Sequence, residues 1–225
     1  MARPKNEETI LKIREAARQL FCDKGYKGAS YSDLSQTSGV NRATVQDYYP
    51  KKRVLATEHL TRLRTCADII ARRQFPNEQS PLAQQYLLGQ VYIASLLSCD
   101  ESRRFLSDIL EDRTFMEDMI ALDAGWSIVY VHAEGGGAIP EEALQDMICV
   151  MGGVYELMFY SVRTRQPIDI AKRLRPGMEV LASLLSMGKQ ECTELLDRCA
   201  LPANEAFRLG FEAFDLAFVQ PWPEE

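Results

Sequence analysis

Apolar residues recur at intervals of three and four along nearly the whole chain, and no segment alternates apolar and polar residues as a half-buried strand does. In the first such segment, the residues that share one helical face are Ile10, Ile13, Ala17, Leu20 and Phe21. A helix with one apolar face leaves water by packing that face against other helices. With 225 residues, the chain can bury a substantial core in this way. We therefore expect an all-α protein.

Start and stop signals divide the first 50 residues into three predicted helices, over residues 6–23, 31–37 and 42–48. Gly25 is expected to stop the first helix. Ser30 stands three residues before Asp33, the spacing of a capping box, in which each side chain accepts a hydrogen bond from the other residue's backbone N–H. Gly39 suits a left-handed turn, and Asn41 suits the cap of the third helix. Two helices joined by so tight a turn form a helix-turn-helix, whose second helix enters the major groove of DNA.

The rest of the chain is predicted to form further helices, separated by Pro and Gly, over residues 51–73, 81–97, 100–111, 114–133, 140–165, 169–187, 190–199 and 203–219. The run Gly135-Gly136-Gly137 is expected to be a loop. Pro176 is expected to kink or restart the helix that contains it, because proline supplies no N–H. The last helix carries a stripe of phenylalanines that we expect to dock it against the body: Phe207, Phe211, Phe214 and Phe218.

Charge is distributed unevenly along the chain. The formal net charge is −6, which by itself disfavours nucleic-acid binding. Residues 1–64, however, carry thirteen Lys and Arg against seven Asp and Glu, a net charge of +6, and the remaining residues carry −12. This asymmetry predicts a basic contact surface on an acidic body, although a basic helix face without any partner would give the same pattern.

The chain offers little for metal or hydrolytic chemistry. Its six cysteines are spread out without a Cys-x-x-Cys pair, and the two histidines, His59 and His132, are far apart. We therefore expect no metal site, no disulfide framework and no cofactor. The adjacent acids Glu111-Asp112 and Glu141-Glu142 diverge on a helix, so we expect no enzyme. The sequence has neither an apolar signal core nor an apolar run of eighteen residues, and we expect a cytoplasmic protein without a membrane partner.

An ordered set of residues at fixed spacing extends over residues 7–55 nearly without gaps: Ala16-Ala17, Leu20-Phe21, Gly25-Tyr26, Ser30, Asp33-Leu34, Ser38-Gly39-Val40-Asn41-Arg42-Ala43-Thr44-Val45, Tyr48-Tyr49, Lys52 and Leu55. This set resembles the DNA-binding head of the TetR/AcrR family of helix-turn-helix transcriptional regulators. Residues 150–153 and 175–188 more weakly resemble the last two core helices of that family, where it forms its dimer.

The resemblance implies a TetR-like fold, with a three-helix DNA-binding head over residues 1–50 and a helical ligand-binding and dimerisation domain over residues 51–220. Additional helices follow after about residue 189. The implied function is a homodimeric transcriptional repressor that binds double-stranded operator DNA. A small, largely apolar effector of unknown identity is expected to release it, although activation in place of repression, or the absence of an effector, stays open.

The resemblance also implies a set of DNA-contacting residues: Ser30, Asn41, Arg42, Ala43, Thr44, Gln46, Tyr48 and Lys52. Arginine can pair with guanine, glutamine with adenine, and alanine or the threonine methyl group can touch a thymine methyl group. Tyr48 and Lys52 are expected to hold phosphates. Gln46 stands where the family usually has tyrosine, and Lys51 and Arg53 add positive charge where the family often has other residues. We expect these departures to change which operator is read.

The remaining residues of the head that we single out are those of the N-terminal arm and of the small core. Arg3 and Lys5 are expected either to follow the DNA backbone as a flexible arm or to contact nothing. Four residues are expected to pack the small core of the head: Val40, Val45, Tyr49 and Leu55.

Large residues on the middle helices, with one cation among them, are candidates for the effector pocket: Tyr92, Arg103, Trp126, Tyr130, Tyr155 and Phe159. The alternative is that these aromatic residues simply fill the core. Met147, Met151 and Met158 are expected to give an adaptable lining or to fill gaps. The dimer interface is expected on the helices over 140–165 and 169–187, through Met151, Gly152, Val154, Met178, Leu181 and Leu185.

Two other classes of function stay open at this point. The first is an enzyme with an all-helical body, for which the sequence offers no catalytic group of residues at a diagnostic spacing. The second is a protein-interaction module built from the C-terminal helices 190–219, which extend beyond the region that resembles the family. These helices are otherwise expected to cover the body or to widen the dimer interface.

Overall fold

A computed structural model describes residues 6–135 and 137–221, and every regular element among them is a helix, which confirms the all-α prediction. The predicted arm residues Arg3 and Lys5 lie outside the described residues. The helices are α1 (Glu7–Gly28), α2 (Tyr31–Ser38), α3 (Arg42–Tyr48), α4 (Lys52–Gln74), α5 (Pro81–Leu97), α6 (Asp100–Leu110), α7 (Arg113–Ala133), α8 (Glu141–Thr164), α9 (Ile170–Leu184), α10 (Lys189–Cys199), α11 (Ala203–Phe214) and the π-helix η1 (Asp215–Val219).

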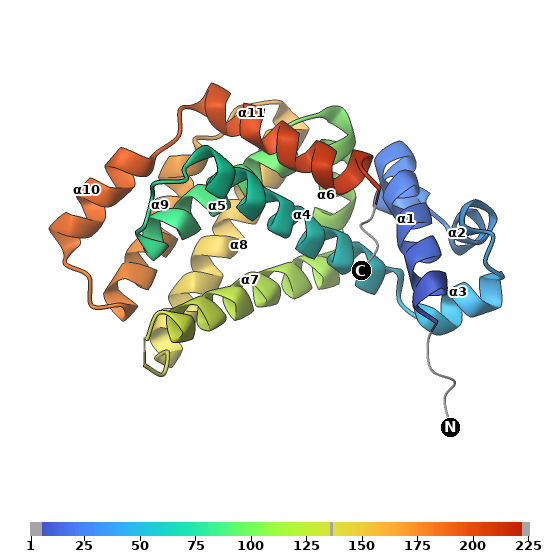
Figure 1. The fold of residues 1–225 in the computed structure, drawn as a ribbon, viewed down its shortest axis with the longest axis horizontal. Coiled ribbons are helices and arrows are strands. Elements are labelled where there is room, and N and C mark those ends of the chain that lie inside the picture. The colour runs from blue at the N-terminus through green and yellow to red at the C-terminus, as the bar shows by residue number, and fades with distance from the viewer. Residues whose placement is uncertain (1–5, 136, 222–225) are drawn as a thin grey trace.

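The first three helices form a small head at one end of an elongated helical body (Figure 1). Its core contains Phe21 of α1, Leu34 of α2 and Val45 of α3, all fully buried. Tyr49 and Leu55, at the start of the connection to the body, are also buried, and Val40 is half-buried against the same core. These apolar residues fix the angle between α2 and α3 and leave the opposite side of α3 facing solvent.

The body is organised around α5, which packs against α4, α9 and α11. Nearly every residue of α5 after its first turn is buried, including the polar Gln90 and Ser95. Gln90 is accommodated because its amide donates to the carbonyl of Cys199 at 3.0 Å and accepts from the N–H of Leu201 at 2.8 Å. The described helices include none that is both long and apolar enough to cross a membrane.

Three local expectations need adjustment. α1 does not end before Gly25: this residue leaves the helical conformation, with φ of 75°, but helical turns resume and continue to Gly28. α9 does not restart at Pro176, because this residue lies inside a single helix with its ring exposed. The phenylalanine stripe docks only in part, since Phe214 and Phe218 are buried whereas Phe211 is 52% exposed.

Gly25 has a packing reason for its unusual conformation. A Cβ atom at this position would lie 2.5 Å from the Asp108 Oδ2 atom of α6. The same oxygen accepts a hydrogen bond from the backbone N–H of Lys27 at 2.8 Å. The break in α1 therefore joins the end of the first head helix to the body.

Gly25→Ala is expected to lower the free energy of unfolding by about 3 kcal/mol, because it adds backbone strain and displaces the carboxylate that Lys27 needs. Gly39→Ala is a control for positive φ: Gly39 has a φ of 68° and nothing lies within 4 Å of its missing Cβ, but its αL conformation strains alanine less than the φ of 75° and ψ of 176° of Gly25. The control should lose about 1 kcal/mol through strain alone. Urea unfolding of both variants measures the difference, and equal losses would contradict the proposed packing role of Gly25.

Candidate DNA interface and ligand cavity

The start of α2 is held by reciprocal side-chain caps. Ser30 Oγ accepts a hydrogen bond from the Asp33 backbone N–H at 3.1 Å, and the Asp33 carboxylate accepts one from the Ser30 N–H at 3.0 Å. Hydrogen bonds from Lys24 and Ser30 hold the pKa of the Asp33 carboxyl well below its ordinary value. The predicted capping box is confirmed.

The turn between α2 and α3 is equally well defined. Gly39 adopts the left-handed conformation that lets α2 stop within one residue. Ser38 Oγ donates to the carbonyl of Leu34 at 2.6 Å, and Asn41 Oδ1 accepts from the N–H of Ala43 at 2.8 Å. These bonds set the direction in which α3 leaves the turn.

The outer side of α3 presents polar and small side chains to solvent. The predicted DNA-contacting residues that are exposed are Ser30, Asn41, Arg42, Ala43 and Gln46, and Thr44 is half-buried. Arg42 makes an exposed contact to Ser32 of α2, where its Nη1 atom lies 3.2 Å from Oγ. A row of exposed side chains on a rigidly seated short helix has the shape and chemistry required to read base edges.

Two residues predicted to hold phosphates have internal partners in the structure. The Tyr48 hydroxyl accepts a hydrogen bond from the backbone N–H of Asn6 at 2.9 Å. Lys52 Nζ donates to the carbonyls of Tyr26 and Ala29, at 2.6 and 2.8 Å, and lies 4.4 Å from the centre of the Tyr26 ring. Burial lowers the pKa of the Lys52 amine. Lys52 thus fastens the end of α1 to the start of α4.

The other two basic residues of this segment have different surroundings. Arg53 forms an ion pair with Asp118 of α7, with 3.2 Å between Nε and Oδ2, so its charge faces the body. Lys51 is exposed beside the head. Of the positive charges that distinguish this segment from the family pattern, Lys51 is the one exposed next to α3.

A second candidate site lies in the body, where α4, α5, α7, α8 and α9 surround a small cavity of about 60 Å³. Two of the predicted effector residues, Tyr92 and Trp126, line this cavity, with their rings edge to face at 6.4 Å between centres. Met147 and Met151 add flexible thioether side chains. A wider groove of about 360 Å³ continues over α4, α5 and α7 and shares Arg64, Gln85 and Trp126 with the cavity.

The other predicted effector residues lie at different distances from this space. Tyr130 lines the wider groove, and its hydroxyl has no hydrogen-bond partner among the described residues. Tyr155 is fully buried and donates its hydroxyl hydrogen to the Asp123 carboxylate on the cavity wall. Arg103 instead donates to the carbonyl of Leu97 at 2.9 Å, and the guanidinium of Arg163 covers the ring of Phe159. Neither Arg103 nor Phe159 lines the cavity or the groove.

Sequence reasoning missed the two charged residues of the cavity, Arg64 and Asp123. The guanidinium carbon of Arg64 lies 4.3 Å from the centre of the Trp126 ring. Asp123 is buried, and burial raises its pKa to about 6, although the Tyr155 hydrogen bond and the Arg64 charge oppose the rise. A signal for Asp123 was present, because it lies in an apolar helix three residues before Trp126 and seven before Tyr130, so that the three residues share one helical face.

The residues predicted for a dimer interface fall into two groups. Val154, Met178 and Leu181 are buried inside the single chain, and Met151 lines the cavity. Gly152 and Leu185 are half-buried. The outer faces of these helices carry other apolar side chains: Ile148 and Tyr160 of α8 are 42% and 56% exposed, and Val180 and Leu184 of α9 are half-buried.

Comparison with known proteins identifies the head. The family model described as "Bacterial regulatory proteins, tetR family" matches residues 13–58. Among solved structures, the chain is similar to "Crystal structure of NalD, the secondary repressor of MexAB-OprM multidrug efflux pump in Pseudomonas aeruginosa", with 21% sequence identity, coverage of 80% of this chain and 94% of that chain, and a TM-score of 0.38. No curated protein matches the chain. The match to the family model confirms the predicted resemblance over residues 13–58.

Asp123→Asn is expected to change how stability depends on pH. The ordinary pKa of 3.8 is raised to about 6 in the folded chain, so the folded chain keeps a proton that the unfolded chain has lost between these values. Asp123 therefore makes the wild type progressively less stable relative to the variant as pH rises from about 4 to about 6, by roughly 3 kcal/mol in total. Urea unfolding of both proteins at several pH values measures this difference in the free energy of unfolding. A difference that does not change with pH would show that the pKa of Asp123 is not raised in the folded chain.

Proposed function

We propose that this TetR-type regulator of transcription is a homodimeric repressor, which a small effector releases from its operator DNA. The observation that carries the DNA-binding part is the exposed polar side of α3, held by caps within the segment that matches the family. We divide the chain into a head over residues 1–50 that binds DNA and a body over residues 51–220 that dimerises and binds the effector. Such a regulator works where operator DNA is accessible, which in bacteria is the cytoplasm.

In this proposal, three exposed side chains of α3 read the operator. Arg42 can donate two hydrogen bonds to a guanine, and Gln46 can pair with an adenine. Ala43 leaves room for a thymine methyl group, and Lys51 supplies a phosphate contact beside the helix. Tyr48 and Lys52 act through the shape of the head, because their polar atoms hold α1 in place.

We place the dimer interface on the outer faces of α8 and α9. Ile148 and Tyr160 are exposed apolar side chains of α8, and the exposed Gly153, seven residues before Tyr160 and so on the same helical face, permits a close approach of a second helix there. Val180 and Leu184 extend this surface onto the neighbouring α9. Three residues that the sequence predicted for the interface are buried within the chain and pack beneath this surface: Val154, Met178 and Leu181.

The effector in this proposal occupies the cavity and the adjoining groove. Trp126, Tyr92 and the methionines favour an apolar body, whereas Arg64 favours a negatively charged or carbonyl oxygen, because no described residue accepts a hydrogen bond from its guanidinium. We therefore refine the expected effector from a largely apolar molecule to an apolar molecule with an acidic or carbonyl group. α4 carries Arg64 and begins next to the head, so an occupied cavity shifts α4 and changes the spacing of the two heads.

Arg42→Ala is expected to weaken binding to an operator selected from genomic fragments by roughly tenfold or more, the value of one bidentate base contact. Arg198→Ala on α10 is the matched control, because Arg198 is exposed and lies outside the head. In titrations at several salt concentrations, the operator affinity of both variants should fall steeply as the salt concentration rises. Sedimentation of the complex should give two chains per operator. Equal affinities of the two variants, or one chain per operator, would contradict this proposal.

Arg64→Met is expected to weaken binding of 8-anilinonaphthalene-1-sulfonate, an apolar fluorescent anion that we use as an effector probe, by roughly tenfold. Arg73→Met is the control, because Arg73 is an exposed residue of the same helix whose partner is Glu212. The probe should also release wild-type protein from the operator. Equal probe affinity of the two variants would show that Arg64 does not recognise the anion.

A further inference from the structure

We propose that residues 215–221, which we name the C-terminal strap, position the DNA-binding head and relay the state of the cavity to it. The strap consists of η1 and the two residues Gln220 and Pro221, and it lies at the junction of α1 and α4 (Figure 1). Its role in regulation rests on the function proposed above. It would be a further connection between body and head, beside the start of α4 and the contact of α1 with α6.

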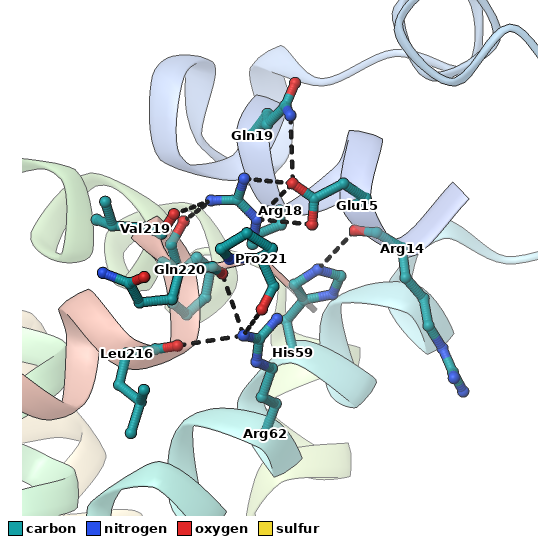
Figure 2. Close-up of polar contacts among 11 residues, drawn as sticks. Arg14, Glu15, Arg18, Gln19, His59, Arg62, Leu216, Val219, Gln220 and Pro221 are labelled. Carbon is teal, nitrogen blue, oxygen red and sulfur yellow. Dashed lines mark hydrogen bonds and ion pairs between the residues drawn. The ribbon is translucent and has the colours of Figure 1, made fainter. Parts of the chain in front are cut away.

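The head contacts the strap through a buried arginine of α1. Arg18 is 8% exposed, and its Nη1 atom donates to the carbonyls of Phe218 and Val219, the latter at 3.0 Å. Its Nε atom donates to the Glu15 carboxylate at 2.9 Å, which neutralises the buried charge (Figure 2). Because the Arg18 guanidinium donates to main-chain carbonyls, it binds the backbone of the strap and orients the strap against α1.

The body holds the same segment through Arg62 of α4. Its Nη2 atom donates to the carbonyls of Leu216 and Gln220, each at 3.1 Å, and of Pro221 at 2.8 Å (Figure 2). The last carbonyls of a helix have no partner within the helix and attract cations. Two arginines, one from the head and one from the body, thus bind five carbonyls of one short segment and connect α1 to α4 through it.

An aromatic cluster fills the space beneath these hydrogen bonds. The Phe218 ring of the strap lies 5.3 Å from Phe105 of α6 and 5.9 Å from His59 of α4, measured between ring centres. Phe21 of α1 closes the cluster, at 5.3 Å from His59. His59 also lies 3.1 Å from the carbonyl of Arg14, so α4 and α1 meet directly behind the strap (Figure 2). Undocking the strap would therefore loosen the packing of α1 against the body.

The strap is also linked to the cavity, because it continues α11. Gly210 brings α11 so close to α5 that a Cβ atom would lie 2.6 Å from the backbone of Ala94 and Ser95. Ser95 Oγ donates to the carbonyl of Tyr92 at 2.6 Å, and the Tyr92 side chain lines the cavity. At so close a contact, a shift of α5 has to move α11, and with it the strap.

Arg62→Gln tests the strap, with Arg208→Gln as matched control, because Arg208 is an exposed residue of α11 that pairs only with Glu205 and Glu212 among the described residues. We expect backbone amides of the strap and of α1 to exchange hydrogen faster in Arg62→Gln. Operator affinity should fall by roughly tenfold, and the response of operator binding to the fluorescent probe should be lost. The probe should still bind, because Arg62 does not line the cavity. Arg62→Lys should restore part of each effect.

A chain that ends at Val219 as a C-terminal amide, so that no new carboxylate faces Arg18, is a milder second variant, since it keeps Phe218 and removes two of the three carbonyls that Arg62 binds. It should shift every readout in the same direction by a smaller factor. Unchanged strap exchange, or a loosened strap with unchanged α1 exchange and operator affinity, would overturn the proposal. If wild-type protein binds no operator, the function proposed above fails, and the exchange of α1 still decides whether the strap positions the head.

Discussion

The burial of α5 on all sides is the constraint on which the rest of the structure depends. Because its residues from Leu82 to Leu97 are nearly all buried, α4, α9 and α11 must cover it at close range. Small residues set these distances: a Cβ atom at Gly89 would lie 3.2 Å from the Leu174 side chain, and Gly210 permits an even closer contact. The body therefore has few ways to accommodate an added molecule except by moving the helices that surround α5.

Polar groups inside this apolar body require specific partners. Gln90 has them in the carbonyl of Cys199 at the end of α10 and the N–H of Leu201 just after it, which makes Gln90 a structural residue. Arg64 and Asp123 differ from Gln90, because burial lowers the pKa of the first and raises that of the second while no hydrogen bond to a described residue satisfies the guanidinium. The Arg64 guanidinium, which lies beside the Trp126 ring without a hydrogen bond to a described residue, is better suited to recognise a ligand than to support the fold.

The sequence was sufficient to predict the elements and insufficient to predict their contacts. The caps at Ser30 and Asn41 and the turn at Gly39 are local, so residue type and spacing identify them. The partners of Lys52 are carbonyls more than twenty residues away, and no local pattern shows that its amine is occupied. The same limit applied to α8 and α9, where apolar periodicity could not distinguish side chains facing the chain's own core, such as Leu181, from those facing outward. Arg64 was missed because its role depends on Trp126, on another helix.

The junction between head and body combines both kinds of constraint. Apolar packing of Phe21, Phe105 and Phe218 stabilises the junction but does not fix the orientation of the strap, because apolar burial is not directional. Arg18 and Arg62 fix this orientation, because their hydrogen bonds to carbonyls form only when the strap lies in one position. Their charge also lowers the cost of release, since a guanidinium that loses its carbonyls to water is rehydrated, whereas an exposed phenylalanine is not. A junction held only by apolar residues would be fixed, and one held only by exposed ion pairs would be weak. The mixture observed here suits a contact that must hold the head in one position and still be reversible.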